Sequence, residues 1–483
     1  MKKNIILLII SNLLLISCHG DLDVIQTSQV SASSMWREEG DATSAMYGLM
    51  NRYRSAFNTA YIYWGEYRTG LWGEGLTSAL DYDQTYQNSM TPAHSMCNWA
   101  DIYTTINAAN LVLKYTPDIS FASEIQKNRV IANAYFVRAF CYYWIGRIWG
   151  DAPLLLEGFE SDKQEGLFPT RESADKVFAQ VGLDIDAALA LMPTSVTDRN
   201  LPSQGALNIL KADYNLWLYK VRNGGATALS NAASAVNTVL NNSMYSLEDD
   251  FSSIFENELG PEIIFALSFI QDEYTGGAAS DWLVPSQYIS PEYIEHPVKV
   301  GSHQQWCFFT SDYKTLLSEN EDDQRTTVSF ETFFDDKKNG TFQWINKFCG
   351  HWVNETRIFD SDIIFYRYAD AVLFDAEIKN ANNDRAGAIT ALNKIAKRAY
   401  GKDNYYSSSL STDEINDAIL NERLKEFAAE GKLWWDYIRM GVAFKRNSYL
   451  TGRENVQNVL LWPVSQTSIN QNPNITQTPG YDK

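Results

Sequence analysis

The stretch Asn421–Met440, NERLKEFAAEGKLWWDYIRM, decides how the fold of this chain is interpreted. Upstream of it stand side chains that favour a helix N-cap, at Ser411, Thr412 and Asp413. Gly431 indicates a stop or a kink, so the sequence predicts a helix of roughly four to five turns before it. One stripe of that helix is apolar at helical spacing, and it consists of Leu420, Leu424, Phe427 and Ala428.

A charged strip runs beside the apolar stripe and carries Arg423, Glu426 and Glu430. Two glutamates four residues apart on one helical face repel each other unless a cation lies between them or opposite them. Arg423 stands three residues before Glu426 and can serve that glutamate. Charges flanked by apolar residues indicate a partly buried ion network, which a large packed helical domain can satisfy. We therefore expect this segment to be framework rather than a catalytic site.

The charged and aromatic residues of this stretch also follow the pattern E-R-x-x-E-(small or apolar)-x-x-E-G-x-R-W-x-D-(apolar)-x-R. The matching residues are Glu422, Arg423, Glu426, Glu430, Gly431, Trp434, Asp436 and Arg439. In these residues the stretch resembles the C-terminal signature of the SusD/RagB family, surface glycan-binding lipoproteins of Bacteroidetes. The chain departs from the signature at Leu433, where the family usually has Arg.

The resemblance continues along the chain in the expected order. Trp36–Tyr53 is similar to the opening of the family, and Trp99–Asn110 to its next element. Arg138–Pro153, RAFCYYWIGRIWGDAP, and Tyr366–Asn380, YRYADAVLFDAEIKN, are similar to two internal segments, and Leu461–Tyr481 to the closing segment. The resemblance implies a mostly α-helical, SusD-like fold with TPR-like helix pairs and an inserted irregular region of loops and short strands.

Helical periodicity predicts where the scaffold lies. Apolar residues recur at helical spacing in 41–57, 98–114, 124–149, 171–191, 204–221, 227–241 and 361–380. Residues 251–359 lack a helical period and contain several Gly and Pro, so loops with short strands are expected there. The predicted organisation is a signal peptide (1–17) and a single domain (18–483), with a helical scaffold (36–250 and 360–445), a loop-rich ligand-facing region (251–359) and a signature tail (459–483).

Charge and composition exclude some classes of partner and cofactor. With 483 residues and a net charge of −19, the protein is a poor electrostatic match for nucleic acid or an anionic membrane surface. Five Cys without a C-x-x-C spacing and only five His argue against a zinc site, so no metal and no cofactor are expected. Cys141 lies in an apolar helical segment and is expected to be a buried thiol.

The N-terminus is predicted to be a targeting signal rather than part of the fold. Two lysines precede an apolar run that is too short to remain in the roughly 30 Å bilayer core as a permanent helix. Leu15–Cys18, LISC, matches the bacterial lipobox, and the alternative is an ordinary secretory signal with an incidental Cys. Cleavage before Cys18 leaves its thiol to carry the lipid, which tethers a soluble domain to a membrane. The acidic Asp21 and Asp23 resemble the surface-export context of Bacteroidetes lipoproteins, which implies an outer-membrane protein facing outward.

Charge balance predicts partners for the two glutamates of the signature. Arg138 and Arg147 stand in the apolar helical segment 124–149 and are expected to meet Glu426 and Glu430.

Other charged and aromatic residues of the predicted helices are assigned to the framework as well. Asp370 and Glu377 lie seven residues apart on one helical face, close to apolar neighbours, and framework ion pairs are expected for them. The tryptophans of the helical segments are expected to be core, and these are Trp99, Trp144, Trp149 and Trp434.

Two irregular segments, Thr59–His94 and Gln271–Trp352, are dense in aromatic residues and stand out against the helical scaffold. Gly and Pro are expected to break any helix in the first, yet it is too apolar for a linker. Loops on a rigid frame commonly carry binding sites. The family resemblance implies a glycan site formed by an exposed aromatic arc near these loops. The expected stacking platforms are Trp72, Tyr67, Trp282 and Trp306, and the expected polar partners are Glu66, Arg68 and Asp281.

These features predict capture of a ligand without chemistry. Sugar rings offer apolar C–H faces that stack on Trp or Tyr and hydroxyl edges that polar side chains bind. The resemblance implies a glycan-binding lipoprotein that delivers oligosaccharide or polysaccharide to a SusC-like TonB-dependent transporter in the outer membrane. The sequence has no G-x-S-x-G, H-E-x-x-H or P-loop motif, and no catalytic residue is assigned.

Three other functions are compatible with the sequence. The same scaffold can bind peptide or another non-glycan nutrient, or the protein can be a purely structural lipoprotein. A helical glycoside hydrolase is the enzymatic alternative, and it needs two carboxylates about 5–9.5 Å apart.

Overall fold

The computed structural model describes residues 35–294, 296–301, 304–354 and 356–481. The chain divides into a short N-terminal unit, Met1–Arg37, and a compact unit, Glu38–Lys483, to which the helices and strands described below belong. The predicted signal peptide and the lipid-carrying Cys18 lie outside the described residues.

Helices dominate the second unit, and the long ones from α3 to α10 begin and end close to the predicted positions. The long helices are α3 (Glu39–Phe57), α6 (Ala100–Tyr115), α7 (Glu124–Trp149), α8 (Ala174–Leu191), α9 (Gln204–Val221), α10 (Gly225–Leu240), α14 (Tyr368–Ala381), α15 (Arg385–Tyr400) and α16 (Thr412–Glu426). The short helices are α4 (Ala60–Gly65), α5 (Leu80–Tyr86), α11 (Ser253–Glu256), α12 (Ser311–Leu317), α13 (Thr326–Ser329), α17 (Leu433–Arg439), α18 (Ala443–Arg446) and α19 (Gln466–Gln471).

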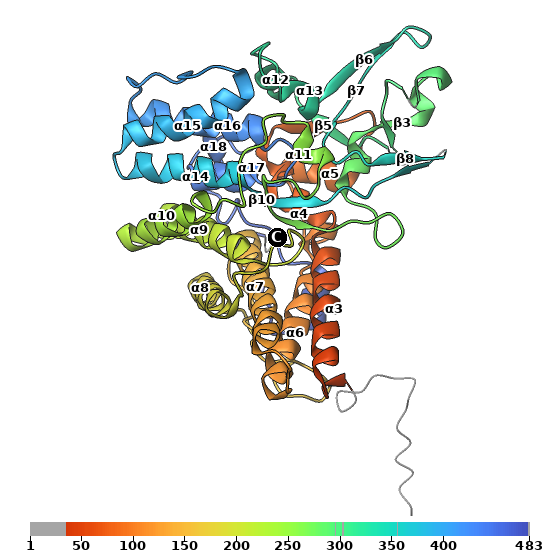
Figure 1. Cartoon of the computed structure of the whole chain (residues 1–483). Helices are drawn as coiled ribbons and strands as arrows, with labels where there is room; N and C mark the ends of the chain where they lie inside the picture. The colour runs from red at the N-terminus through yellow and green to blue at the C-terminus, as the bar shows by residue number, and fades with distance from the viewer. Residues whose placement is uncertain (1–34, 295, 302–303, 355, 482–483) are drawn as a thin grey trace, which may run out of the picture. The chain divides into compact units, whose positions relative to one another are not determined.

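Helix α7 lies at the centre of the scaffold because its second half is buried on every side. Every residue from Phe136 to Trp149 is buried, and a helix of that kind must be covered all round. Figure 1 shows α3 and α6 beside it, and α8 packs on it as well. Gly150, with φ of 72°, ends the helix.

Consecutive helices pack in pairs, α7 with α8, α9 with α10 and α14 with α15. The predicted fold class, a mostly α-helical fold with TPR-like helix pairs and an inserted irregular region, is confirmed.

Strands are short and form separate two-stranded ladders. Four ladders are antiparallel: β1 (Trp72–Glu74) with β5 (Cys307–Phe309), β2 (Ile263–Leu267) with β10 (Ile363–Arg367), β6 (Glu331–Asp335) with β7 (Gly340–Trp344), and β8 (His351–Val353) with β9 (Thr356–Ile358). The pair β3 (Val284–Pro285) and β4 (Val300–Gly301) is parallel. Most of these strands lie in residues 251–359, where loops and short strands were predicted.

Two of the predictions about helices are wrong. The segment 361–380 begins with strand β10 and becomes helical only at Tyr368, because Ile363–Arg367 is buried on both faces against β2. The glycine-broken segment Thr59–His94 contains the short helices α4 and α5. Helix α4 ends at the first glycine of the segment, Gly65, and α5 lies beyond the last, Gly75, so the glycines interrupt neither helix.

An aromatic core joins α3 and α7 to the β2–β10 ladder. The rings of Phe140 and Phe365 lie 4.9 Å apart, and those of Tyr53 and Phe140 lie 5.3 Å apart, both edge to face. Phe136 meets Phe265 in the same way at 5.0 Å. Edge-to-face contacts of this kind add to the stabilisation from apolar burial. The tryptophans assigned to the core are buried as predicted, and they are Trp99, Trp144, Trp149 and Trp434.

The signature segment begins as predicted and ends earlier. Ser411 accepts a hydrogen bond from the Glu414 backbone N–H, and the Glu414 carboxylate accepts one from the Ser411 N–H, which is a capping box. Helix α16 then stops at Glu426 rather than at Gly431. Ala429 and Gly431, with φ of 64° and 72°, form a tight turn in the left-handed region before α17 begins.

Glu426 is fully buried and meets three guanidinium groups. Its carboxylate lies 2.5 Å from Arg367 and 3.1 Å from Arg325, and it is also paired with Arg398. Burial opposes the charged form, but Arg398, Arg367 and Arg325 outweigh it and hold the pKa of Glu426 well below its ordinary value of 4.5. The predicted buried ion network is therefore present, and it is larger than a triad.

Glu430 is held in the same way by different groups. Arg367 approaches it at 3.0 Å and Lys347 at 2.8 Å, with all three side chains fully buried. Burial raises the pKa of this carboxyl, and Arg367, Lys347 and Lys432 lower it further than burial raises it, to about 2. The result is a buried charge cluster, in which each carboxylate depends on its cations.

The predicted partners of these two glutamates are wrong. Arg138 pairs with Asp184 at 2.7 Å, and Arg147 faces Asp213 at 3.6 Å. Both arginines do lie on the buried side of α7. The cations that reach the glutamates come instead from β10, α15 and the irregular region, which sequence spacing does not bring together.

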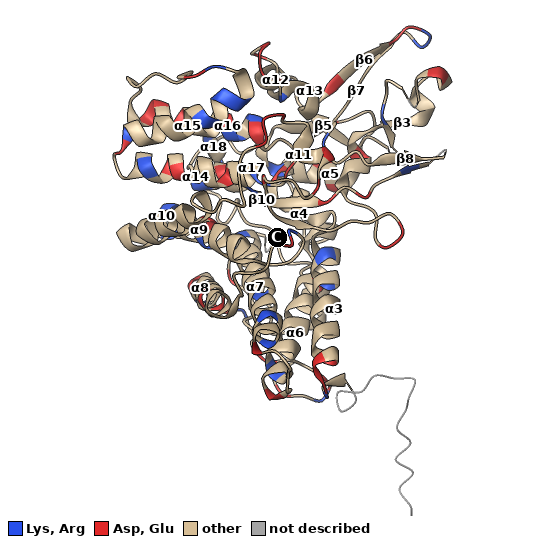
Figure 2. Ribbon diagram, viewed as in Figure 1, with Lys and Arg blue, Asp and Glu red and all other residues tan. Residues whose placement is uncertain are grey.

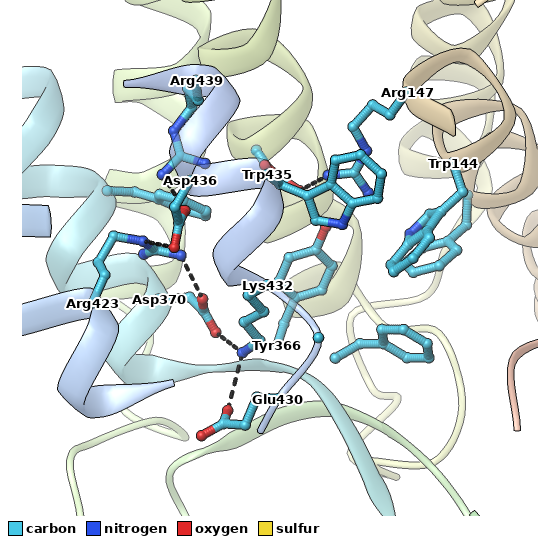
Figure 3. Close-up of a pocket in the computed structure, with 15 residues that line it drawn as sticks. Trp144, Arg147, Tyr366, Asp370, Arg423, Glu430, Lys432, Trp435, Asp436 and Arg439 are labelled. Carbon is cyan, nitrogen blue, oxygen red and sulfur yellow. Dashed lines mark hydrogen bonds and ion pairs between the residues drawn. The ribbon is translucent and has the colours of Figure 1, made fainter. Parts of the chain in front are cut away.

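Arg423 does not serve Glu426 either. Its guanidinium pairs instead with Asp436 at 2.7 Å and with Asp370 at 3.6 Å (Figure 3). The framework role predicted for Asp370 and for Glu377 is confirmed, since Glu377 pairs with Arg439 at 3.1 Å inside the protein. Figure 2 shows acidic and basic residues interspersed along α14, α15 and α16, the helices that supply much of this network.

The four described cysteines form no disulfide. Cys97, Cys141, Cys307 and Cys349 are free and buried, as expected for Cys141. Among the described helices, none combines the length and the apolar character that a membrane span requires.

The network predicts a large and pH-dependent loss of stability on neutralising Glu430. Glu430→Gln leaves Arg367 and Lys347 short of a counter-charge inside the protein, so we expect the free energy of unfolding to fall by about 3–5 kcal/mol at pH 7. Because the folded pKa values of Glu426 and Glu430 lie below 4.5, their stabilisation is complete above about pH 4.5 and lost as the pH falls toward 2.

Urea denaturation at pH 7 and at pH 3 measures both effects, with the exposed Glu165→Gln as control. The difference between wild type and Glu430→Gln should shrink at pH 3. A Glu430→Gln protein as stable as wild type at pH 7 would show that the cluster contributes nothing.

Candidate functional site

The two irregular segments meet along the β1–β5 ladder. Trp72 pairs with Phe309 and Glu74 with Cys307 in this ladder. Beyond it, the Gly75 N–H donates to the Trp306 carbonyl at 3.3 Å. A side chain at Gly75 would collide with the Gln305 carbonyl, 2.2 Å from the Cβ position, so the close approach requires glycine. Segments more than 200 residues apart in sequence therefore form one region.

Below the ladder lies a sealed cluster of aromatic rings. The ring of Trp72 is 4.8 Å from Tyr67, 4.6 Å from Phe309 and 5.7 Å from Trp282. Trp282 donates a hydrogen bond to the Tyr67 hydroxyl at 2.8 Å. Trp72 and Trp282 have no exposed surface.

Glu66 connects this cluster to the signature turn. Its carboxylate accepts hydrogen bonds from the backbone N–H groups of Ala429 at 2.6 Å and Gly431 at 2.7 Å, and from the Trp72 indole at 3.3 Å. Burial raises the pKa of Glu66 to about 8, against the opposing effect of the two backbone donors. Glu66 is thus a structural link between α4 and the turn that precedes α17.

Arg68 holds the C-terminal tail. Its guanidinium donates to the carbonyls of Val459 at 2.6 Å and Leu460 at 2.8 Å, and to the Asn88 side chain at 2.9 Å. It also lies over the Trp434 ring, 4.5 Å from the centroid. Burial lowers the pKa of Arg68 to about 10.

Six of the seven predicted ligand-binding residues are therefore corrected in their role. The structure brings all of them except Arg68 into one connected region, but Glu66, Tyr67, Arg68, Trp72, Asp281 and Trp282 are buried and already bonded within the protein. The physical reason is packing: the glycine-broken segment folds into short helices whose large rings fill the space under the β1–β5 ladder. These residues are the foundation of the region and not its open surface.

Trp306 is the exception, because it is only partly buried. Its ring lies 5.3 Å from that of Tyr82, with the two planes tilted by 38°. Tyr82 is itself held by a hydrogen bond, because its hydroxyl donates to Asp281 at 2.5 Å. Burial and the Asp281 carboxylate raise the pKa of Tyr82, so it stays a neutral phenol. The predicted platform Trp306 thus rests on a rigid neighbour.

A second buried tyrosine lies one helical turn away and leads to an exposed ring. Tyr86 follows Tyr82 by four residues on α5, so the two lie on the same face. Tyr86 meets Tyr449 with 6.4 Å between ring centroids, and Tyr449 is 43% exposed. We call Trp306, Tyr82, Tyr86 and Tyr449 the aromatic ledge. Its two ends face water and its two middle rings are buried.

Two carboxylates lie beside Tyr86 in the ledge. Asp83 accepts a hydrogen bond from the Tyr86 hydroxyl at 2.8 Å, and Glu74 lies close enough to raise the pKa of Tyr86 further. Such a surface can stack the apolar face of a ring and bind hydroxyl groups through carboxylates, without needing a charge on the ligand.

Of the four ledge rings, the sequence analysis assigned one to a binding role. Trp306 was named, whereas Tyr82, Tyr86 and Tyr449 were not. The i, i+4 spacing of Tyr82 and Tyr86 within DYDQTY was a usable signal for the two middle rings. Nothing in the sequence near Tyr449 points to it, because its position depends on how the segment after α18 folds back onto α5.

A polar hollow of about 670 Å³ opens elsewhere in the irregular region. Its lining includes Glu258, Glu331, Lys299 and His351. Most of its polar groups have partners in the protein; for example, His351 bonds to Asp360 at 3.0 Å. Within the described residues, no cluster of three or more His, Cys, Asp or Glu side chains could hold a metal ion.

Comparisons with known proteins agree with this architecture. A model of the SusD family matches residues 334–481, and a model described as starch-binding and associating with the outer membrane matches residues 50–208. The chain is 27% identical over 504 residues to SusD-like protein P38 of Formosa agariphila, with 98% of each chain covered. It is 25% identical over 369 residues to SusD-like protein P2 of the same bacterium, with 71% of each chain covered.

Solved structures show the same fold. NanU of B. fragilis has a TM-score of 0.81 at 24% identity, covering 95% of this chain and 100% of its own. A SusD superfamily protein from Bacteroides vulgatus has a TM-score of 0.80 at 24% identity, covering 92% and 100%.

The division into foundation and ledge predicts different costs of truncation. Trp72→Ala removes a ring with no exposure from a packed cluster, so we expect a loss of about 3–5 kcal/mol. Trp306→Ala should cost at most about 2 kcal/mol, because part of the ring already faces water. Urea denaturation followed by far-ultraviolet circular dichroism measures both. Equal losses in the two variants would contradict the division.

Proposed function

Because the chain belongs to the SusD family, whose members are generally glycan-binding proteins of nutrient acquisition, we propose that it captures oligosaccharide or polysaccharide on the aromatic ledge. The ligand is passed on uncleaved to a SusC-like TonB-dependent transporter. The protein is attached to the outer membrane through the lipid on Cys18 and faces outward. The match to a family described as associating with the outer membrane supports this location.

The observation that carries the proposal is the ledge itself. Trp306 and Tyr449 present rings to water at its two ends, and each rests on a buried tyrosine of the same helix. Rigid aromatic rings lose little conformational entropy when a ligand stacks on them, which favours binding. The carboxylates beside the ledge accept hydrogen bonds from hydroxyl groups, and the net charge of −19 does not oppose a neutral polymer.

A binding role also fits the way the carboxylates of the region are used. Glu66 and Asp281 are occupied by donors from the protein, and Asp83 is bonded to Tyr86. We assign no catalytic residue to the ledge.

We expect loss of glycan binding when the exposed rings are removed. Trp306→Ala and Tyr449→Ala should each weaken binding about tenfold, because each removes a stacking surface. Tyr47→Ala is the matched control, since Tyr47 is 52% exposed on α3 and lies outside the ledge. Affinity electrophoresis against a panel of polysaccharides measures retardation, and an assay for new reducing ends detects cleavage.

The outcomes separate the possible functions. Retardation of wild type that is lost in both ledge variants, without new reducing ends, supports the proposal. New reducing ends would indicate a glycoside hydrolase. Absence of retardation with every polysaccharide would favour a different nutrient as the ligand.

A further inference from the structure

The polar hollow of the irregular region brings a thiol and an amine into contact. Cys349 and Lys299 both line this hollow of about 670 Å³. The Lys299 Nζ lies 3.3 Å from the Cys349 Sγ and donates a hydrogen bond to it. The sulfur in turn donates to the Asn346 carbonyl at 3.0 Å. The ammonium of Lys299 thus bonds to a sulfur, although the carboxylates of Glu258 and Glu331 line the same hollow.

The other three described cysteines have different surroundings. Cys97, Cys141 and Cys307 are 0%, 0% and 1% exposed, whereas Cys349 is 8% exposed. None of these three lines the hollow. Burial raises the pKa of each of their thiols, so they stay protonated. Oxidants react with the thiolate of an accessible cysteine, and among the described residues Cys349 is the thiol that an external oxidant can reach.

The backbone on both sides of Cys349 is held in place. Phe348 and Gly350 have φ of 57° and 60°, in the left-handed region. A Cβ at Gly350 would lie 1.8 Å from the Ile358 carbonyl oxygen, so the close approach of the two segments requires glycine. Arg357 donates to the carbonyls of Cys349 at 2.9 Å and of Gly350 at 3.3 Å. The position from which the sulfur projects is therefore fixed.

Lys299 is anchored where the parallel pair of β3 and β4 begins. Its carbonyl accepts a hydrogen bond from the Val284 N–H at 3.3 Å, and the next two residues form β4. The amine and the thiol therefore come from segments that are 50 residues apart in sequence. A bond between the two side chains would fasten β4 to the turn before β8.

We propose that Lys299 and Cys349 form a modification site, at which hydrogen peroxide joins the two side chains through a covalent sulfur–nitrogen bond. The Nζ atom already lies 3.3 Å from the Sγ atom, so forming the bond requires only a closing movement of two side chains. The bond acts as a redox-dependent clasp within the irregular region. The clasp is independent of glycan capture, because neither residue belongs to the ledge.

Two steps form the bond. The Cys349 thiol first loses its proton, and the thiolate attacks one oxygen of hydrogen peroxide. The O–O bond breaks, hydroxide takes up a proton and leaves as water, and Cys349 becomes a sulfenic acid. Lys299 then releases its ammonium proton to the solvent, and the nitrogen lone pair attacks the sulfur. The S–O bond breaks, and hydroxide leaves as water with a second proton from the nitrogen. One peroxide is reduced for each sulfur that is oxidised.

Mass spectrometry of the full-length protein after treatment with hydrogen peroxide tests the proposal. Digestion with trypsin and chymotrypsin should yield a linked peptide pair that contains Lys299 and Cys349. The pair should be lighter by two hydrogen atoms than the sum of the two free peptides. Dithiothreitol, which is oxidised to its own disulfide, should separate the pair again. Timed alkylation should show that Cys349 is oxidised at least about tenfold faster than the other three described thiols.

Two substitutions separate the roles of the amine and the sulfur. Lys299→Arg keeps the cation and removes the amine, so the linked pair should disappear while dimedone still captures the sulfenic acid of Cys349. Cys349→Ser removes the sulfur and should abolish both products. Lys338→Arg is the matched control, because it changes an exposed lysine of the irregular region that does not line the hollow, and it should leave the link unchanged.

The clasp also has a thermal signature. A cross-link between positions 50 residues apart restricts the unfolded chain. The thermal midpoint of peroxide-treated wild type should therefore lie at least about 2 °C above that of the protein reduced with dithiothreitol. Lys299→Arg should show no such rise.

The proposal is overturned by any of four results. Oxidation of wild-type Cys349 to a sulfinic or sulfonic acid without a linked pair would show that the amine does not reach the sulfur. A linked pair in unchanged yield from Lys299→Arg would place the second nitrogen elsewhere. Failure of Cys349 to react faster than the three other described thiols would show that the hollow gives no access to it. An unchanged thermal midpoint in fully linked protein would show that the bond fastens nothing.

Discussion

The buried guanidinium of Arg367 is the contact on which the rest of the structure depends. It donates to Glu262 before β2, to Glu426 at the end of α16 and to Glu430 in the turn beyond, and all four side chains are fully buried. These residues come from the ladder, the last long helix and the signature turn. Each carboxylate is stable inside the protein only while its cations are in place. The network therefore fixes how the irregular region and the helical scaffold are joined.

The turn that contains Ala429 and Gly431 also connects the buried ion network to the aromatic ledge. Its Ala429 and Gly431 N–H groups donate to Glu66, and Glu66 also accepts from the Trp72 indole. A Cβ at Gly65 would lie 1.8 Å from the Gly431 carbonyl oxygen, so the two backbones touch. From Trp72 the contacts run through Tyr67 and Tyr82 to Trp306 at the ledge. A binding surface held in this way is already organised before a ligand arrives, which reduces the entropic cost of binding.

Sequence patterns were sufficient for some parts of this account and not for others. Apolar spacing placed α7 at residues 124–149, and the capping residues placed the start of α16 at Ser411. Both are local properties of the chain. The partners of the ion pairs could not be predicted in this way. Charge alone indicated that Glu426 and Glu430 need cations, but Arg367 and Lys347 come close to them only in the tertiary fold.

The binding residues show the same limit. Aromatic density in the two glycine- and proline-broken segments correctly marked a region that the fold brings together. It could not separate the buried Trp72 and Trp282 from the partly exposed Trp306, because core and surface rings are the same residue types. Tyr449 reaches the ledge through the segment that follows α18, where Asn447 donates a hydrogen bond to the Arg68 carbonyl at 2.6 Å. Residues joined only by long-range packing leave no local pattern to detect.

The central claim is that the ledge is locked to the ionic core, and native-state hydrogen exchange measures this most directly. The amides of Leu76 and Thr310, which bond across the two irregular segments, can be compared with the Leu373 amide in buried helix α14. If the account is right, all three exchange only through global unfolding, with protection factors within about tenfold of one another. Exchange of Leu76 and Thr310 about a thousandfold faster than that of Leu373 would show that the ledge opens independently of the core, and would contradict the account.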